Sequence, residues 1–530
     1  MWFGSAFDLS PALLSLRESF LRVGRRPIGA RRPSRNEEFI MIYTFFSSTR
    51  YFWPVMAAFS TGLVVSQVAA QSVQPNFVVV LVDDMRWDDF GAGGHPFVQT
   101  PNIDRVAREG VLFTNAFTTT PLCSPARASL LTGLYSHTHG IIDNTDRADR
   151  SRQLKTFPQS LDAAGYDTAF VGKWHMGTDG GRRPGFDYWV SLSGQGSNED
   201  PLLTEGDTQK LVAGHVTDIF TERAVGFLKR ARNDPFLLYF SHKALHPDPR
   251  LGLVEGGFIA AERHRGIYDD YHILRRPSTG IPPFDKPALM RKIEGLPPLG
   301  LDTSTSDRTI RDRLEMMTGV DESVGQLLEV LESRGELDNT VFIITSDHGY
   351  FYGEHGLNPQ RRLAYEETAR IPMIIRYPVL IGAGQREKRI ALNIDLAPTV
   401  LDLAGQPGVE TLQGRSLVPL LNNEVSEWRS NFLIEHHTDP PNYLGQATDS
   451  LADARRRQVS EFMRVSDMGY KAVRSERYKY IQYAGLERMD ELYDLESDPY
   501  ELENLVELGH AQPIVREMRE QLSRLLKETQ

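Results

Sequence analysis

The stretch Phe77–Val82, FVVVLV, is an unbroken apolar run of mostly β-branched side chains, and the carboxylate pair Asp83-Asp84 follows it directly. Such a run is typical of a strand buried on both faces of a parallel sheet. In open α/β sheets, ligands lie beyond the carboxyl ends of the strands. The stretch therefore predicts a central strand with a polar site at its end.

The chain on either side of this run repeats the order strand, then helix. Apolar runs at Phe236–Phe240 and Val341–Thr345 are further candidates for central strands, and a long helical pattern, Asp307–Arg334, precedes the second. This alternation predicts a large mixed, mostly parallel sheet sandwiched by helices. The shorter expected elements are helices at 101–109, 123–132, 158–164 and 394–403 and strands at 111–117, 168–171 and 371–376.

The pattern changes after Gly405. The sequences SNFLIEHH, YKAVRSERYKYIQYA and DELYDL are typical of an antiparallel sheet, and the final PIVREMREQLSRLLKETQ is typical of an amphipathic helix. We therefore expect an α/β domain at 71–425 and a smaller C-terminal α+β domain at 426–530. Residues 250–305 are rich in Pro and Gly and lack periodicity, which predicts a long surface insertion.

The first 70 residues are predicted to be a targeting segment. Arg50 precedes the apolar run Trp53–Val65, and small residues follow before position 71, as in a signal peptide. The run is too short for a comfortable membrane span. The arginine-rich residues 1–40 have two interpretations: Met41 is the true initiator, or the export signal is extended. We expect a secreted or periplasmic protein with no membrane span once the signal is removed.

The net charge and the cysteine content exclude some classes of partner and of site. The formal net charge of the 530 residues is −11, and because an acidic surface repels phosphate backbones, nucleic acid is not expected as the main partner. A single cysteine, Cys123, allows no internal disulfide and no cysteine-rich metal site. From the count alone, an inert buried cysteine is the simpler interpretation. Its context, C-x-P-x-R at the start of a predicted helix, is a weak signal alone and becomes specific only together with the other motifs of the chain.

Two acidic pairs suggest a metal site. Asp83-Asp84 ends the first strand, and Asp347-His348 follows Val341–Thr345 in the same way. Adjacent carboxylates repel each other unless a cation lies between them, although a solvated turn would also explain one pair alone. Oxygen-rich ligands favour Ca²⁺ or Mg²⁺ over zinc.

The order of motifs along the chain resembles that of the type I, formylglycine-dependent sulfatases of the alkaline phosphatase-like superfamily, whose signature is C-x-P-x-R-x-x-L-x-T-G. The resemblance covers nearly the whole chain from residue 76, and it implies a sulfuric ester hydrolase, with sulfated carbohydrate as the expected substrate. The motifs that carry it are the strand-end DD, LCSPARASLLTG at 122–133, GKWH at 172–175, SDHG at 346–349 and the C-terminal YKYI…ELYDLE…DP…E.

The resemblance implies that a formylglycine-generating enzyme converts Cys123 to an aldehyde during maturation. The hydrated aldehyde carries two hydroxyls: one takes the sulfuryl group, and deprotonation of the other then expels sulfate, whereas a serine would be trapped as a stable ester. A helix N-terminus at this residue would add N–H groups and partial positive charge for the anionic sulfate.

The resemblance also implies a set of ligands for one Ca²⁺. The matching positions are Asp83, Asp84, Cys123, Asp347 and His348. His348 occupies a position where family members carry Asn or His, and imidazole is a softer ligand for calcium than an oxygen group.

Further roles follow from the same resemblance. Arg127 would pair with the modified side chain and the cation site, and Lys173 would bind sulfate. His175 would be the base that deprotonates the second hydroxyl. Lys173 and His175 are two residues apart, so on an extended chain both would point to one side; without the family, this pair would be an ordinary surface loop. His246 would contact the substrate and protonate the leaving oxygen, in preference to its neighbours His242 and Lys243.

The chain departs from the family pattern at one place. Many relatives carry a lysine in a D-K-R-like stretch before the YEE segment, whereas here the sequence GLNPQRRLAYEE offers Arg361 and Arg362. An arginine can bind sulfate through two hydrogen bonds. We assign the substrate contact to Arg361, with Arg362 as the open alternative.

Two other functions fit the same sequence. One is a phosphonate monoester or phosphodiester hydrolase of the same superfamily, which paired assays of sulfate and phosphate esters would distinguish. The other is a non-catalytic carbohydrate-binding protein on this fold, which a measured absence of aldehyde and metal would favour.

Overall fold

A computed structural model describes residues 74–251, 256–294, 299, 305–357, 361–407, 411–439 and 462–530. Residues 70–530 form one compact unit. The predicted targeting segment at 1–70 lies outside the described residues. No helix in the described part of the chain is long and apolar enough to cross a membrane.

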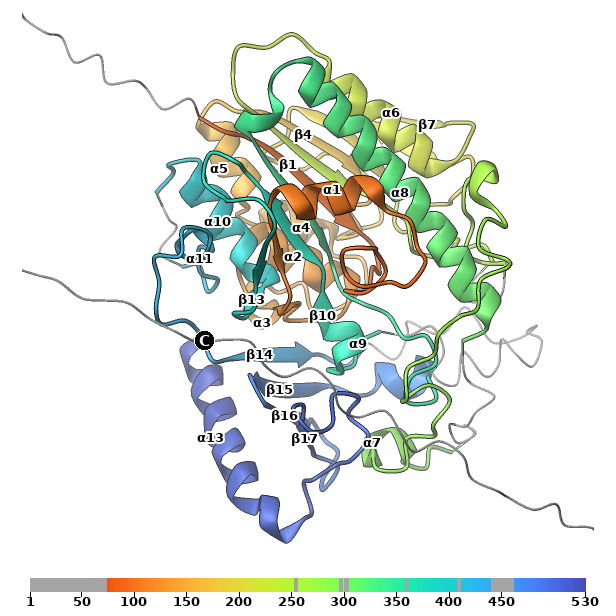
Figure 1. The fold of residues 1–530 in the computed structure, drawn as a ribbon, viewed down its shortest axis with the longest axis vertical. Helices are drawn as coiled ribbons and strands as arrows, with labels where there is room; N and C mark the ends of the chain where they lie inside the picture. The colour runs from red at the N-terminus through yellow and green to blue at the C-terminus, as the bar shows by residue number, and fades with distance from the viewer. Residues whose placement is uncertain are drawn as a thin grey trace, which may run out of the picture. The chain divides into compact units, whose positions relative to one another are not determined.

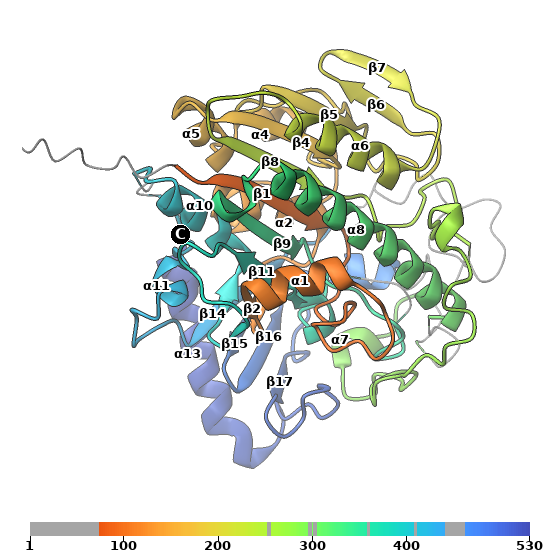
Figure 2. The ribbon, with the colours of Figure 1, turned by 45° about the horizontal axis from the view of Figure 1, so that its top comes forward.

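A ten-stranded mixed sheet forms the centre of this unit, in the order β12-β2-β11-β9-β1-β8-β4-β5-β6-β7 (Figures 1 and 2). β1 (Asn76–Val82) lies between β8 (Phe236–Ser241) and β9 (Thr340–Ser346), is parallel to both, and is buried along its whole length. The predicted central strands are confirmed. The other strands are β2 (Val111–Phe113), β4 (Asp167–Gly172), β5 (Tyr188–Leu192), β6 (Leu202–Glu205), β7 (Thr208–Leu211), β11 (Met373–Arg376) and β12 (Gln385–Glu387).

Helices cover both faces of the sheet (Figure 2). Val78, Val80 and Val82 of β1 enter one core with three helices, and the alternate residues of β1 enter another core with three different helices. This alternation follows from the two-residue period of a strand. The first set is α1 (Pro101–Glu109), α6 (Val216–Leu228) and α8 (Asp307–Ser333); the second is α2 (Cys123–Thr132), α5 (Phe157–Ala163) and α10 (Leu396–Leu403).

A smaller antiparallel sheet lies in the C-terminal part of the chain, blue in Figure 1. It is built from β14 (Asn431–His436), β15 (Tyr470–Ser475), β16 (Tyr478–Tyr483) and β17 (Glu491–Asp494). The amphipathic helix α13 (Gln512–Glu528) buries Val515, Met518 and Leu522 in the same core as this sheet. The predicted fold class is confirmed, whereas the division between residues 425 and 426 stays a prediction.

Two of the predicted strands are each divided between two sheets. The stretch 111–117 separates into β2 and β3 (Ala116–Phe117), and 371–376 separates into β10 (Arg370–Ile371) and β11. β3 and β10 belong to a three-stranded sheet with β13 (Ala391–Leu392). The second break falls at Pro372, which has no backbone N–H to donate to a neighbouring strand.

The prediction of a surface insertion at 250–305 is wrong in part. Phe258, Tyr268 and Ile273 are buried in the core with α6 and α8, and Ala288 and Leu289 are buried in the core of the C-terminal sheet. These apolar residues follow no period, and an irregular segment can bury single side chains without producing a pattern in the sequence.

Candidate active site

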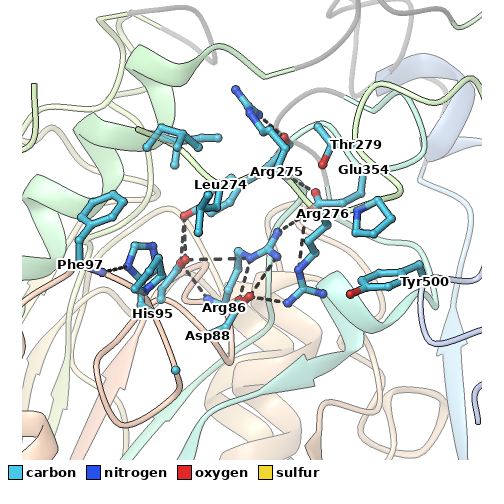
Figure 3. A pocket seen from close by; sticks show the side chains of 17 residues that line it. Arg86, Asp88, His95, Phe97, Leu274, Arg275, Arg276, Thr279, Glu354 and Tyr500 are labelled. Carbon is cyan, nitrogen blue, oxygen red and sulfur yellow. Dashed lines mark hydrogen bonds and ion pairs between the residues drawn. The ribbon is translucent and has the colours of Figure 1, made fainter. Parts of the chain in front are cut away.

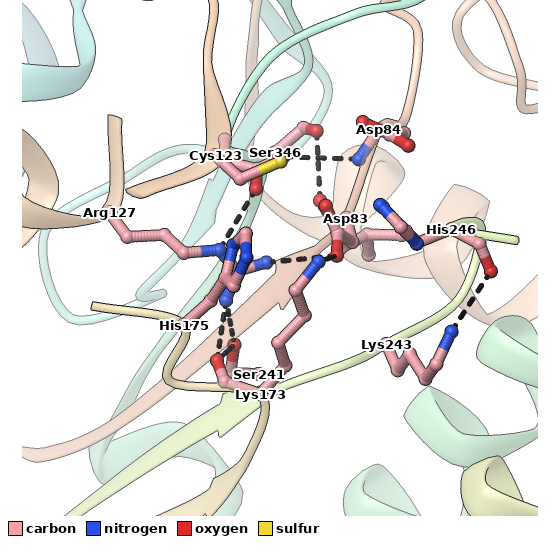
Figure 4. A network of polar contacts seen from close by, with 12 residues as sticks. Asp83, Asp84, Cys123, Arg127, Lys173, His175, Ser241, Lys243, His246 and Ser346 are labelled. Atoms are coloured by element: carbon pink, nitrogen blue, oxygen red, sulfur yellow. Dashed lines mark hydrogen bonds and ion pairs between the residues drawn. The ribbon is translucent and has the colours of Figure 1, made fainter. Parts of the chain in front are cut away.

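Polar side chains from four parallel strands meet at one edge of the large sheet (Figure 4). Asp83-Asp84 follow β1, Asp347-His348 follow β9, Lys173 follows β4, and His246 lies five residues after β8. All of these side chains are buried. Parallel strands bring their carboxyl ends to the same edge, so the two acidic pairs converge as the sequence predicts.

Gly172 allows β4 to approach β8 closely. A Cβ atom on Gly172 would lie 1.7 Å from the backbone oxygen of Ser241, and its φ of 131° is one that residues with a side chain rarely adopt. The next residue, Lys173, donates its backbone N–H to the same oxygen at 2.9 Å. Its side chain then contacts the carboxylate of Asp83. The glycine of GKWH is therefore what positions the lysine.

Helix α2 begins at Cys123 and carries Arg127 one turn later. The Arg127 guanidinium donates to Asp347 Oδ2 at 3.0 Å and to Ser241 Oγ at 2.7 Å, and lies 3.5 Å from Asp83 Oδ2. Burial opposes its charge, but the carboxylates of Asp347 and Asp83 raise the pKa of Arg127. Arg127 thus connects the start of α2 to the ends of β1, β8 and β9.

Four side chains are arranged as metal ligands would be. Asp83, Cys123, Asp347 and His348 each offer one ligand atom, and these atoms lie within 4.8 Å of one another. His348 Nε2 is 3.2 Å from Cys123 Sγ. The buried oxygen Asp83 Oδ1 has no hydrogen-bond partner among the described residues. A buried carboxylate oxygen needs a donor or a cation. The two carboxylates of this set fit a hard cation, to which a thiol and an imidazole are softer ligands.

Asp84, the fifth expected ligand, lies beside this group rather than in it. Its Oδ2 accepts a hydrogen bond from Arg361 at 3.0 Å, and its Oδ1 is 3.4 Å from His348 Nδ1. Oδ1 itself is buried and has no hydrogen-bond partner in the described part of the chain. Asp84 therefore also presents an acceptor to which a cation could bind.

The acids of the cluster do not ionise alike. Burial opposes ionisation of Asp83, yet Lys173 and Arg127 hold its pKa well below the ordinary value. Burial and the neighbouring Asp83 raise the pKa of Asp347 to about 6. For His348, burial opposes the charged form, but Asp347 and Cys123 raise its pKa to about 9. The two carboxylates repel each other, as expected of groups that share a cation.

Arg361 lies between Asp84 and His246. Its Nη2 is 3.1 Å from His246 Nε2, while His246 Nδ1 donates to the Pro247 oxygen at 2.9 Å. The imidazole therefore has its proton on Nδ1, and its Nε2 accepts from Arg361. Burial and the charge of Lys173 keep the pKa of His246 well below the ordinary value.

Arg362 points elsewhere. Its φ is 88°, and its Nε contacts Asp439 Oδ2 at 3.0 Å. The backbone turn between the two arginines directs Arg361 to the cluster and Arg362 to the segment after β14. The geometry favours Arg361 as the residue in the place of the usual lysine.

The backbone after β4 differs from the expected extended chain. His175 adopts a left-handed φ of 63°, and Asp84 has a similar φ of 60°. Each such residue costs about 1 kcal/mol relative to an ordinary conformation. Ser124 Oγ donates to the His175 oxygen at 2.5 Å and lies 3.5 Å from its Nδ1. His175 reaches the start of α2 because of this turn and not because of a two-residue alternation.

Two buried basic side chains support the loop that carries His246. Lys243 Nζ donates to the oxygens of His246 at 3.3 Å and Pro247 at 2.8 Å. Arg313 of α8, also buried, donates to the oxygens of Asp84 at 2.7 Å and Leu245 at 3.0 Å. The sequence indicated neither role. Lys243 was visible only as a neighbour of His246, and Arg313 lies in a helical pattern where an arginine is expected on the surface.

Sequence and structure comparisons agree with this geometry. The sulfatase family model matches residues 75–406, and a model for the C-terminal part of N-sulphoglucosamine sulphohydrolase matches 460–528. N-acetylglucosamine-6-O-sulfatase of Bacteroides thetaiotaomicron is 32% identical over 533 residues and covers 90% of this chain and 89% of that protein. N-acetylglucosamine-6-sulfatase of Homo sapiens is 28% identical and covers 83% of this chain and 82% of that one.

A solved structure is also similar to this chain over most of its length. It is the complex of a protein with its substrate, D-glucosamine-2-N,6-O-disulfate, and it matches this chain with a TM-score of 0.71 at 29% identity, covering 86% of this chain and 98% of the other. The family match spans more than half of the chain and contains every residue of the strand-end cluster. The chain therefore belongs to the sulfatase family of sulfuric ester hydrolases.

Proposed function

We propose that the chain hydrolyses sulfate esters of sulfated carbohydrates, after conversion of Cys123 to formylglycine and with one bound Ca²⁺. One observation carries the proposal: the only cysteine of the chain is the first residue of α2, and its Sγ lies within 4.8 Å of ligand atoms of Asp83, Asp347 and His348. A structural cysteine would be expected among apolar side chains. Cys123 Sγ instead marks where a hydroxyl of the hydrated aldehyde would lie.

The unpaired buried oxygens of Asp83 and Asp84 support the cation. With Asp347, His348 and the modified residue 123, they would hold it. When bound, the cation would lower the pKa of the attacking hydroxyl and attract the sulfate oxygens.

The chain's own cations and helix would bind the sulfate group. Arg127 and Lys173 are both buried, and both lie against Asp83, which belongs to the same cluster as Cys123. In the first turn of α2, Ser124 N–H donates to Asn144 Oδ1 at 2.9 Å, and Ala126 N–H donates to the Leu122 oxygen. Because residue 125 is a proline without an N–H, the helix would contribute mainly the partial positive charge of its N-terminus. These positive groups lie inside the protein, where their interaction with the anion is stronger than in water.

Two neutral imidazoles would move the protons. His175 lies beside Ser124 at the start of α2, so it is suited to act as the base at residue 123. His246 Nε2 accepts from Arg361 in the absence of substrate. An incoming sulfate would give Arg361 a second anion to contact, and the same negative charge would raise the pKa of His246. His246 would then protonate the leaving oxygen.

The relatives suggest which sugar carries the sulfate. The relatives named above act, by their names, on the 6-sulfate of N-acetylglucosamine. We therefore propose a 6-O-sulfated glucosamine residue as the substrate class. Export of the chain before it acts, expected from its first 70 residues, is part of the proposal and can be checked by cell fractionation.

A panel of esters tests the proposed function. Sulfate release is measured from N-acetylglucosamine 6-sulfate, its 3-sulfate isomer and 4-nitrophenyl sulfate, and nitrophenol release is measured from a matched 4-nitrophenyl phosphonate monoester. The proposal predicts that the 6-sulfate gives the highest kcat/KM. Equal values for the two sugar isomers would contradict the assigned substrate, and faster hydrolysis of the phosphonate would favour the phosphonate hydrolase.

A further inference from the structure

A second polar pocket, of about 300 Å³, lies outside the catalytic cluster. We call it the Trp87 pocket. Its walls come from five segments: the loop after β1, the loop that contains Arg276, α9 (Glu366–Ala369) with the start of β10, β15, and the stretch after β17. The residues that line it are Trp87, Arg276, Glu366, Arg370, Arg474, Leu495, Pro499 and Tyr500.

Two hydrogen-bond donors in this pocket are unpaired. The indole Nε1 of Trp87 and the Nε of Arg370 are buried, and neither has a hydrogen-bond partner among the residues that the structure describes. The Arg370 guanidinium lies 4.0 Å over the Trp87 ring, so the two donors come from groups in contact. Buried donors normally have an acceptor, so this pair indicates a missing one.

The charges of the lining residues have the sign that an anion requires. Of the three lining arginines, Arg276 is paired with Asp88 of the neighbouring pocket, and the one carboxylate among the lining residues is Glu366. That carboxylate is itself 2.9 Å from Lys479 Nζ and 3.4 Å from Arg474. Arg370 has no carboxylate within 4.0 Å in the described part of the chain. Arg370 is therefore the lining arginine whose positive charge has no carboxylate partner.

The neighbouring pocket, of about 240 Å³, serves as a contrast (Figure 3). It shares Arg276 and Tyr500 with the Trp87 pocket. Here Arg86 lies 3.0 Å from Asp88 and 2.9 Å from Glu354, and Arg276 also contacts Asp88. These arginines are neutralised by acids of the same pocket, so arginine content alone does not make an anion site.

We propose that the Trp87 pocket binds a sulfate group, either as inorganic sulfate or as part of a sulfated saccharide, at a site separate from the catalytic one. Sulfate oxygens would accept from Trp87 Nε1 and Arg370 Nε, and the guanidinium groups match such an oxyanion in charge and geometry. Ligand pockets range from about 300 to 1,000 Å³, so this one has room for one sulfated sugar unit beside Tyr500.

Calorimetric titration tests this site. The full chain with Cys123→Ala, which cannot turn over, is titrated with inorganic sulfate, glucosamine 6-sulfate and unsulfated glucosamine. Trp87→Phe keeps an aromatic ring and removes the indole N–H, and Arg370→Lys keeps the positive charge and removes the guanidinium donors, Nε–H among them. Trp428→Phe is the matched control, because its Nε1 already donates to the Ile390 oxygen at 2.7 Å and it is not among the lining residues.

The parent of these variants, the Cys123→Ala chain, is expected to bind two sulfate groups per chain. Trp87→Phe and Arg370→Lys should each weaken one of them about tenfold and leave the other unchanged, which is the effect of losing one hydrogen bond to a charged group. Trp428→Phe should behave as the parent. If the second site binds glucosamine 6-sulfate but not glucosamine, its ligand is a sulfated saccharide. If it binds only inorganic sulfate, its ligand is the free anion.

Two results would overturn the proposal. One is a stoichiometry of a single sulfate group per parent chain for both sulfated ligands. The other is equal affinity in Trp87→Phe, Arg370→Lys and Trp428→Phe. Melting temperatures identify a variant that has lost its fold. If one variant does not fold, the proposal is tested by the stoichiometry of the Cys123→Ala chain and by the affinity of the other variant.

Discussion

The catalytic cluster and the Trp87 pocket are both polar sites with unpaired atoms, but only the catalytic cluster has unpaired acceptors among the described residues. These are Asp83 Oδ1 and Asp84 Oδ1, and an unpaired donor beside them, Arg127 Nη2, lies 3.5 Å from Asp83 Oδ2. In the Trp87 pocket the unpaired atoms are donors, Trp87 Nε1 and Arg370 Nε. A buried acceptor requires a cation or a donor, and a buried donor requires an acceptor. The difference therefore indicates the charge of each partner: a metal ion in the first site and an oxyanion in the second.

The two sites also differ in how the chain builds them. The acids of the catalytic cluster directly follow neighbouring strands of one sheet, so a rigid scaffold sets their positions. The Trp87 pocket collects side chains from five separate segments. Substitutions in the catalytic cluster should therefore affect chemistry severely, while substitutions in the Trp87 pocket should affect only binding there.

The largest effect is expected at residue 123. Cys123→Ala removes the nucleophile, so turnover of every sulfate ester should fall by at least about 10⁴-fold. The side chain is small, so the melting temperature should change little. Steady-state kinetics and thermal unfolding measure both. Turnover above about 1% of the parent in this variant would remove Cys123 from the mechanism.

The second-largest effect tests whether a cation binds at the catalytic cluster. Asp347→Asn and Asp83→Asn each remove one carboxylate charge from the cluster, and both metal content and kcat should fall, the latter by about 10²-fold or more. Elemental analysis of dialysed protein gives the metal content. Asp149→Asn is the matched control, because the Asp149 side chain is 100% exposed. Unchanged metal content in both cluster variants would mean that the cation binds elsewhere.

A third effect separates the two histidines. His246→Gln should slow hydrolysis of sugar sulfates about 10²-fold and that of 4-nitrophenyl sulfate only slightly, because nitrophenolate leaves without a proton. His175→Gln should instead form the sulfated intermediate and stall, with a burst and a mass gain of about 80 Da. Both variants are assayed on both esters with intact-mass detection. Equal losses on both esters and no trapped adduct would refute this division of roles.

The smallest effect concerns the loop that carries His246. Lys243→Met loses the bonds to the His246 and Pro247 oxygens, so protonation of the leaving group should weaken. We expect a loss of about tenfold on sugar sulfates and little change on 4-nitrophenyl sulfate, the same signature as His246→Gln but weaker. Lys527→Met, at an exposed position of α13, is the control. An equal loss on both esters would mean that Lys243 only supports the fold.

The sequence predicts those parts of the molecule that are encoded locally. The buried run of β1, the start of α2 at Cys123 and the acids after β1 and β9 each leave a signal within about ten residues. Arg313 and Ser241 leave none, because their partners Asp84 and Arg127 lie far away in the sequence. The Trp87 pocket was missed for the same reason: its unpaired donors can be recognised only once the surrounding segments are in place.

Mass analysis of the peptide that contains residue 123 tests the central claim most directly. Preparations made with and without a formylglycine-generating enzyme are compared for the fraction of that peptide that is lighter by about 18 Da, the difference between cysteine and the aldehyde. The account predicts that kcat per chain is proportional to this fraction and is zero at zero conversion. Full turnover from a preparation in which residue 123 is entirely thiol would contradict it.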